Sequence, residues 1–176
     1  LGGTSTTGSV NLNTNAPAGG VTVQLYTTSS IAGVPFSVTV PAGQKTATFT
    51  VTTSPVSANT QVQVVGKFLG VAKPATLTVQ AAAVTTVTLN PTSVKGGTNS
   101  TMTIKLTGLA GPSGLVVTLT SSNVNAATVP STVTVPAGTN TVDVVVTTKV
   151  VTANTTSTLT AKTSASSKTV LLTVTK

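Results

Sequence analysis

A hexapeptide, Val-Thr-Val-Pro-Ala-Gly, occurs at residues 38–43 and again at residues 133–138, which is 95 residues further along the chain. Internal repetition at a fixed spacing indicates that one structural unit is used twice. Further matches include Val-Pro at 34–35 and 129–130, Val-Thr-Thr at 51–53 and 146–148, Leu-Thr-Val at 77–79 and 172–174, and Gly-Gly-Thr at 2–4 and 96–98. The last pair has a spacing of 94, so we expect one inserted residue, in the loop around Pro17 or Pro112.

Threonine and valine dominate the chain, with 42 threonines and 30 valines among 176 residues. Both are β-branched and favour strands over helices. A repeat of about 95 residues suits a seven-stranded sandwich of ~100 residues. The alternation between turn signals predicts the strands of the second copy, at residues 84–90, 100–107, 115–121, 126–135, 141–148, 156–162 and 168–175.

Period-two alternation also predicts which side chains face the core. Met102, Ile104 and Leu106 share one face of their strand, and Val142, Val144 and Val146 share one face of another, with Asp143 on the opposite face. Each Pro-Ala-Gly segment predicts a turn, since proline ends a strand and glycine permits positive φ. The Asn90-Pro91 step is expected to let the first strand cross from one sheet to the other.

The first copy is short at its beginning. Residues 85–93 precede the Gly-Gly pair of the second copy, whereas only Leu1 precedes that of the first. The sequence therefore predicts an all-β fold of two tandem immunoglobulin-like Greek-key β-sandwiches, 1–81 and 82–176, the first lacking its N-terminal strand. Two explanations stay open: the chain is a piece of a longer tandem array, or a neighbouring subunit donates a strand to the open edge.

The connection between the copies, residues 80–83, reads Gln-Ala-Ala-Ala. This is too short for a flexible Gly/Ser tether. We expect consecutive sandwiches to sit end to end with limited freedom.

Three segments of the second copy carry a recognisable pattern. They are Val-Thr-Leu-Asn-Pro-Thr-Ser-Val-Lys-Gly-Gly at 87–97, Val-Thr-Leu-Thr-Ser-Ser-Asn at 117–123, and Val-Pro-Ala-Gly at 135–138. This pattern resembles the tandem bacterial immunoglobulin-like (Big-type) repeats of secreted and cell-surface proteins, and it covers the chain twice. The resemblance implies a Greek-key sandwich, export, and a role as stalk, adhesin arm, fibre or spacer. It carries no catalytic residues.

The composition excludes most enzyme chemistry. The chain has no histidine, no cysteine and one acidic residue, Asp143. Nucleophile–base pairs and paired carboxylates cannot be assembled from this set, and the ligands for a transition metal or calcium are lacking. We therefore predict no enzymatic activity, no catalytic residue, no metal and no cofactor.

The charge and the hydrophobic pattern also limit the partners. Nine lysines give a net charge of +8, but they are scattered and have neither arginine forks nor aromatic platforms beside them, which argues against nucleic-acid binding. No apolar run approaches the ~20 residues of a membrane helix, so no membrane insertion is expected. The N-terminus lacks the pattern of a signal peptide, which suggests a processed form or a piece of a longer chain.

Several residues are candidate surface contacts. Tyr26 and Phe68 are expected to be partly exposed, and Val145 faces outward beside Thr147, whereas Phe36 and Phe49 have the parity of core residues. Tyr26 and Phe68 could stack on a sugar, although scattered surface aromatics are common.

Three further residues are candidates for modification. Asn99 and Asn154 lie in Asn-X-Ser/Thr sequons and could carry glycans. Asp143 could assist a Lys–Asn isopeptide bond only if it were buried, and the alternation places it outside.

Two functions follow from these observations. The favoured one is a structural repeat of an extracellular filament, surface stalk or adhesin of bacterial type, self-assembling with neighbouring copies of the same repeat, head to tail through strand donation. The alternative is a glycan- or surface-binding accessory module of a secreted multidomain enzyme. That module would use loops such as 13–20, 110–114 and 121–127. Both place the protein outside the cell or at its surface.

Overall fold

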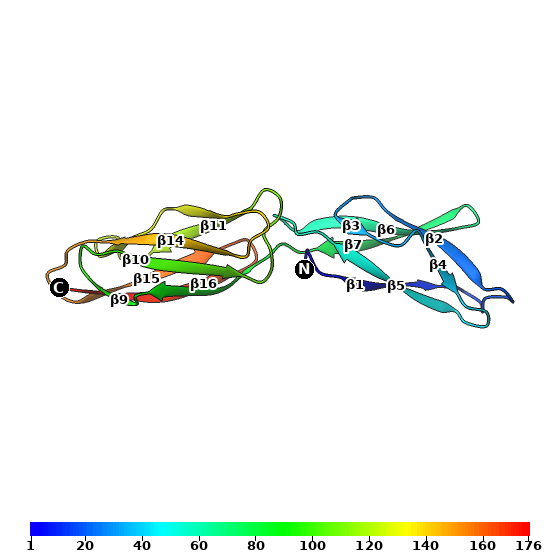
Figure 1. Cartoon of the computed structure of the whole chain (residues 1–176), viewed down its shortest axis with the longest axis horizontal. Helices are drawn as coiled ribbons and strands as arrows, with labels where there is room; N and C mark the ends of the chain where they lie inside the picture. The colour runs from blue at the N-terminus through cyan, green and yellow to red at the C-terminus, as the bar shows by residue number, and fades with distance from the viewer. The chain divides into compact units, whose positions relative to one another are not determined.

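The computed structural model describes residues 1–176 and contains strands and loops but no helix (Figure 1). The chain forms two compact units, unit 1 (residues 1–80) and unit 2 (residues 81–176). Each unit has its own pair of sheets. No segment is a helix long and apolar enough to cross a membrane.

Unit 2 is a complete sandwich of two sheets. One sheet has the order β12-β14-β10-β8, with bounds Ala127–Thr128, Thr141–Thr148, Ser100–Leu106 and Val84–Asn90. The other has the order β13-β11-β15-β16-β9, with bounds Thr132–Val135, Leu115–Ser121, Thr155–Lys162, Ser167–Thr175 and Ser93–Lys95. All pairs are antiparallel except β9 with β16. This is the strand order of an immunoglobulin-like sandwich, so the predicted fold class is confirmed.

The core of unit 2 lies between the sheets and follows the period-two pattern. Met102 and Ile104 are fully buried and Leu106 nearly so, as predicted. Val144 and Val146 are also buried and Val142 is partly buried, while Asp143, between Val142 and Val144, is exposed. The alternation therefore identified the core of this unit correctly.

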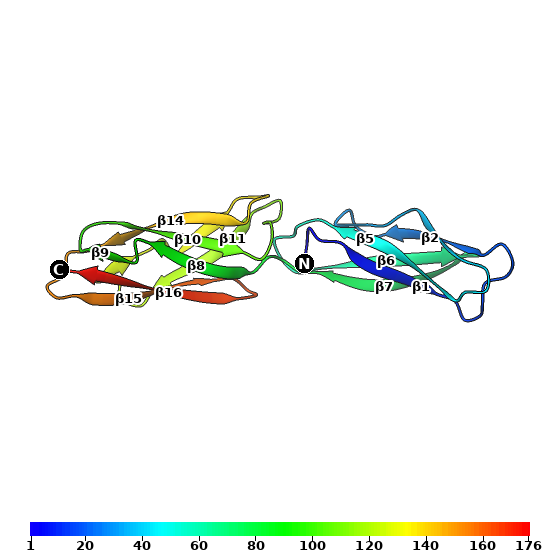
Figure 2. The ribbon, with the colours of Figure 1, turned by 60° about the horizontal axis from the view of Figure 1, so that its bottom comes forward.

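The first strand of unit 2 does cross between the sheets. β8 pairs with β10 in one sheet, and β9 pairs with β16 in the other. Figure 2 shows β8 and β9 on the two sides of the bend between them. Ser100 Oγ donates a hydrogen bond to the Pro91 carbonyl at 2.6 Å and holds this bend.

Two strand predictions need correction. The single strand expected at 126–135 is two short strands, because β12 pairs with β14 in one sheet and β13 pairs with β11 in the other. Pro130 lies between them, where its missing N–H and fixed φ interrupt a ladder. β9 was not expected separately from β8.

Unit 1 contains seven strands in two sheets. One has the order β1-β5-β3, with bounds Thr6–Asn11, Thr46–Thr53 and Ala32–Gly33. The other has the order β4-β2-β6-β7, with bounds Ser37–Val40, Val21–Thr27, Thr60–Phe68 and Val71–Val79. No strand of unit 1 corresponds to β8 or β9, which confirms the predicted lack of a first strand.

Equivalent hydrogen bonds occur in the two units around the turns that precede β1 and β10. The Gly2 N–H donates to the Gln80 carbonyl at 2.8 Å, as the Gly96 N–H does to the Thr175 carbonyl. Thr53 Oγ1 donates to the Thr4 carbonyl, as Thr148 Oγ1 does to that of Thr98. The same turn therefore leads into β1 in unit 1 and into β10 in unit 2.

The predicted position of the insertion is wrong. The loops at Pro17 and at Pro112 close with the same turn and the same length, since the Gly20 N–H donates to the Pro17 carbonyl and the Gly114 N–H to that of Gly111. The difference in residue number between equivalent positions of the two units is 94 up to the ends of β2 and β11, and it is 95 from β3 and β12 onward. The extra residue lies in the loop 122–126, which corresponds to 28–31 in unit 1.

The two Pro-Ala-Gly turns have the expected conformation. Gly43 has φ of 75° and Gly138 has φ of 72°. These values lie in the left-handed region, which glycine adopts at least cost. Each turn connects the short strand β4 or β13 to the long strand β5 or β14.

Candidate functional site

Strand pairing shows which residues of the two units are equivalent. In unit 1, β1 pairs with β5 and sets Gly8 opposite Phe49. In unit 2, β10 pairs with β14 and sets Met102 opposite Val144. By this register Gly8 corresponds to Met102, and the inward positions Val10 and Leu12 correspond to Ile104 and Leu106.

These equivalent positions differ strongly in burial. Ile104 is 0% exposed and Leu106 is 2% exposed. Val10 and Leu12 are only partly buried. In unit 2 the cover comes from β8, whose Val87 lies opposite Ile104 and whose Val84 lies opposite Leu106. Nothing in unit 1 provides this cover, so the apolar side chains of β1 remain open to solvent.

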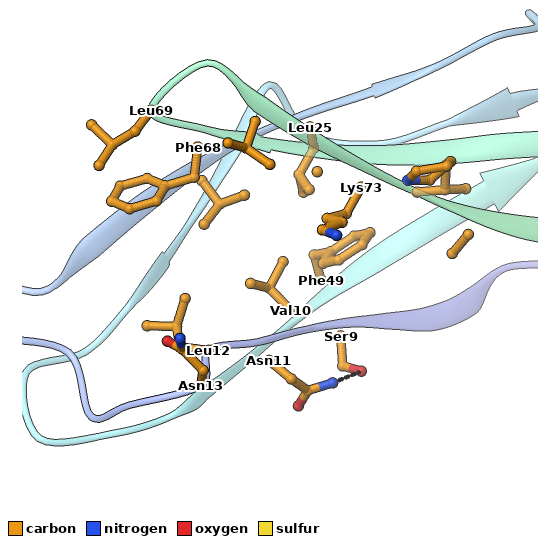
Figure 3. A pocket seen from close by; sticks show the side chains of 16 residues that line it. Ser9, Val10, Asn11, Leu12, Asn13, Leu25, Phe49, Phe68, Leu69 and Lys73 are labelled. Atoms are coloured by element: carbon orange, nitrogen blue, oxygen red, sulfur yellow. Dashed lines mark hydrogen bonds between the residues drawn. The ribbon is translucent and has the colours of Figure 1, made fainter.

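The result is an open groove of about 620 Å³ in unit 1. Figure 3 shows it between β1 on one side and the β6–β7 hairpin on the other, with Phe49 and Leu25 at its floor. Its apolar lining comes from Val10, Leu12, Val23, Leu25, Phe49, Val64, Gly66, Phe68, Leu69, Val71, Pro74 and Ala75. Ser9, Asn11, Asn13 and Lys73 complete the lining. The groove is thus a largely apolar channel along a strand.

A second hollow of about 240 Å³ continues the same path. Thr6 and Leu77 are among its lining residues. Thr6 corresponds to Ser100, which in unit 2 bonds to the Pro91 carbonyl at the bend between β8 and β9. The two hollows together follow the course that β8 and the β8–β9 bend take in unit 2.

Two unpaired strand edges flank the groove. β1 is at the edge of its sheet and bonds only to β5, and β7 is at the edge of its sheet and bonds only to β6. An exposed edge presents a row of free N–H and C=O groups, which is a template for a further strand. The groove therefore offers both backbone partners and an apolar channel.

Lys73 supplies the only charge in the groove. It shares strand parity with Leu77 and buried Val79, so it lies on the inward face of β7. Figure 3 shows its amine turned into the groove. No carboxylate, imidazole or thiol lines the groove, and nowhere in the chain do three or more such groups lie together as metal ligands. The arrangement is suited to binding an extended chain.

The structure separates the two aromatics considered for sugar stacking. Tyr26 is 46% exposed, and its cross-strand partner is Val65. Phe68 shares parity with Val62, Val64 and Gly66 on the inward face of β6 and lines the groove. Cross-strand partners share a face, so Tyr26 and Phe68 lie on opposite faces and form no common platform.

The two other phenylalanines differ from expectation. Phe36 was predicted to be in the core but is 78% exposed, because it lies before β4 begins and the strand alternation does not extend to it. Phe49 points inward but is only half buried and forms part of the groove.

The remaining candidate residues are on the surface of unit 2. Val145, Asn99 and Asn154 are exposed, and Asn154 Oδ1 accepts a hydrogen bond from the Lys176 N–H. Asp143 is exposed and accepts a bond from Thr103 Oγ1 at 2.6 Å. Glycosylation at Asn99 and Asn154 remains a prediction.

Sequence reasoning missed the groove residues themselves. The alternation predicted burial for Phe49, which is only partly buried, and it did not single out Val10 or Leu12. The lack of a first strand in the first copy is the sequence feature that could have identified them, because that strand would cover these positions.

No protein-family model and no curated protein sequence matches this chain. Among solved structures, the chain is similar to the D0–D1 domains of intimin, with 18% identity over 99% of this chain and 92% of that chain and a TM-score of 0.43. It is similar to domains 4 and 5 of the S-layer protein SbsC, with 22% identity over 91% and 73% and a TM-score of 0.40. Invasin, described as a bacterial integrin-binding protein, matches with 18% identity over 96% of this chain and 39% of that chain, with a TM-score of 0.49. The strand order described above establishes the fold independently of these likenesses.

Proposed function

We propose that this chain is a non-enzymatic structural module of an extracellular or cell-surface structure, such as a filament, stalk or adhesin. In this proposal it joins a neighbouring subunit by accepting a donated strand in the groove of unit 1. The observation that carries the proposal is the partial exposure of Val10 and Leu12, whose counterparts Ile104 and Leu106 are sealed by β8.

The energetics favour an added strand. A Val or Leu side chain that becomes fully buried contributes about 1.5–3 kcal/mol. A donated strand would bury its own inward side chains and complete the burial of Val10 and Leu12. Pairing with the β1 edge would add backbone hydrogen bonds, as in other cases of strand addition. This gain must exceed the cost of ordering the donor, about 1–2 kcal/mol for each residue.

Strand donation would make a directional assembly. The donor surface and the acceptor groove are different, so the contact is heterologous, and a heterologous contact that does not close into a ring gives a fibre. The partners are thus neighbouring copies of the same repeat or subunit, with no nucleic acid and no membrane insertion.

The outward faces carry many hydroxyl groups and few charges, and Thr22 and Thr39 on neighbouring strands form a hydroxyl–hydroxyl bond of 3.0 Å. Such cross-strand pairs stabilise a sheet without charged groups. The absence of a shared aromatic platform at Tyr26 and Phe68 leaves the alternative, a glycan-binding accessory module, with less support.

Hydrogen exchange tests the proposal on assembled material. We expect the β1 amides to exchange rapidly in the dispersed chain and slowly in the assembly, while β10 amides exchange slowly in both, because β10 lies between β8 and β14. Rapid exchange along β1 within a verified assembly would exclude strand donation.

A further inference from the structure

The groove of unit 1 differs in shape from the site that β8 fills in unit 2. The registers of β6 with β7 and of β15 with β16 make Val64 equivalent to Leu159 and Gly66 equivalent to Ala161. Leu159 and Ala161 are fully buried in unit 2. Unit 1 therefore has smaller side chains at two positions that face the covering strand.

Other inward positions of unit 1 are smaller too. Val10 stands where unit 2 has Ile104, and Ala75 stands where unit 2 has Val170, which packs against the core. Val10, Val64, Gly66 and Ala75 all line the groove. A strand with the side chains of β8 would leave unfilled space here, and unfilled apolar space is costly.

At one cross-strand pair of unit 1, a smaller side chain and a larger one offset each other. Gly8 replaces Met102, and Phe49 replaces the smaller Val144. A Cβ placed on Gly8 would lie 2.4 Å from Phe49 Cζ, so the phenyl ring occupies the space above the glycine. The position opposite Gly8, which Leu89 occupies in unit 2, is therefore not enlarged in the same way.

The groove also extends further than the β8 site. The β6–β7 turn carries Phe68, Leu69 and Val71, of which Leu69 is 86% exposed. The equivalent residues of unit 2 are Thr163, Ser164 and Ser166, which are polar. This apolar turn lies beside Leu12, where the N-terminal end of a strand antiparallel to β1 would lie.

From these differences we infer that unit 1 selects a bulkier and longer strand than β8. The inference rests on the proposed strand acceptance and defines its partner. The occupant is an extended polypeptide segment that runs antiparallel to β1. It has Leu-sized or larger side chains at the places of Val84 and Val87, and one more apolar residue towards the β6–β7 turn.

The positive charge of the groove also limits which donor segments fit. Lys73 is the charged residue in the groove, and unit 1 contains no acidic residue. A carboxylate near the N-terminal end of the donor would meet an unpaired ammonium group there, whereas a lysine would meet repulsion. The segment that fits is thus apolar on one face and neutral or acidic at its start.

Synthetic peptides test this inference on the full chain. The first copies residues 81–95. The second carries Ala82→Phe, Val84→Leu and Val87→Leu, and the third carries Val84→Asn and Val87→Asn. Fluorescence anisotropy of labelled peptides measures binding, and hydrogen exchange of β1 locates it. We expect the second peptide to bind at least about tenfold more tightly than the first, since each added buried methylene contributes about a factor of four, and the third not to bind.

A groove variant provides the matched control. Val10→Ile with Val64→Leu gives unit 1 the side chains of unit 2, and we expect the preference for the second peptide to fall to about threefold or less. Equal or tighter binding of the first peptide to the unaltered chain would overturn the size inference and leave strand acceptance standing. Failure of both apolar peptides to bind would overturn strand acceptance itself.

Discussion

Truncation of matched residues in the two units measures how open the groove is in solution. Ile104 and Val10 occupy equivalent places on β10 and β1, but Ile104 is 0% exposed beneath β8 and Val10 is partly exposed. We predict that Ile104→Ala destabilises unit 2 by about 3–4 kcal/mol, because a sealed core retains much of the cavity that the deletion leaves.

The cost of Val10→Ala should be much smaller. Two methyl groups are removed, each contributing about 0.8 kcal/mol when fully buried. Val10 is only partly buried and its surroundings open to water, so no closed cavity forms. We therefore expect a loss of about 0.5–1 kcal/mol, which is less than a third of the Ile104→Ala effect.

Urea unfolding can report each unit separately. Tyr26 is the only tyrosine of the chain and lies in unit 1, so its fluorescence follows that unit, while far-ultraviolet circular dichroism follows both. A loss of 3 kcal/mol or more for Val10→Ala in the monomeric chain would show that Val10 is sealed in solution. That result would show that the groove is not an open binding site.

Three further substitutions test other parts of the structure. Gly138→Ala should cost about 1 kcal/mol in thermal unfolding, because its φ of 72° is unfavourable for alanine and no neighbour lies within 4 Å to add a clash. Thr148→Val should cost about 1–3 kcal/mol in urea unfolding, since the buried hydroxyl bonds both the Gly97 N–H and the Thr98 carbonyl; an unchanged midpoint would exclude this role. Asp143→Asn should change stability by less than about 0.5 kcal/mol, and the intact mass of the unaltered chain should equal the sequence mass, because Asp143 is exposed; a mass lower by one ammonia would instead reveal an isopeptide bond.

The sequence predicted the architecture because two simple signals agree along most of the chain. Alternation identified Met102, Ile104 and Leu106 as core residues, and the repeat spacing showed that unit 1 lacks a counterpart of β8. Both signals depend on residue type and position alone. They failed where the chain changes sheets, as at Pro130. The alternation continues on both sides of this residue, but β12 pairs with β14 in one sheet and β13 pairs with β11 in the other.

The groove could be predicted only in part. The lack of the first strand is visible in the sequence, but its consequences for Val10 and Phe49 depend on which side chains face the uncovered path. Phe36 shows the same limit, since its parity suggests burial while its place before β4 leaves it 78% exposed. The size differences at Val64 and Gly66 acquire meaning only once the register assigns their partners in unit 2.

A reconstruction of the native assembly by electron cryomicroscopy tests the central claim most directly. We predict density for an additional strand in unit 1, antiparallel to β1, that lies over Val10 and Leu12 and passes beside Lys73. Neighbouring subunits should be linked through this strand. An assembly in which the groove between β1 and β7 is empty, with subunits joined through other surfaces, would contradict the proposed function.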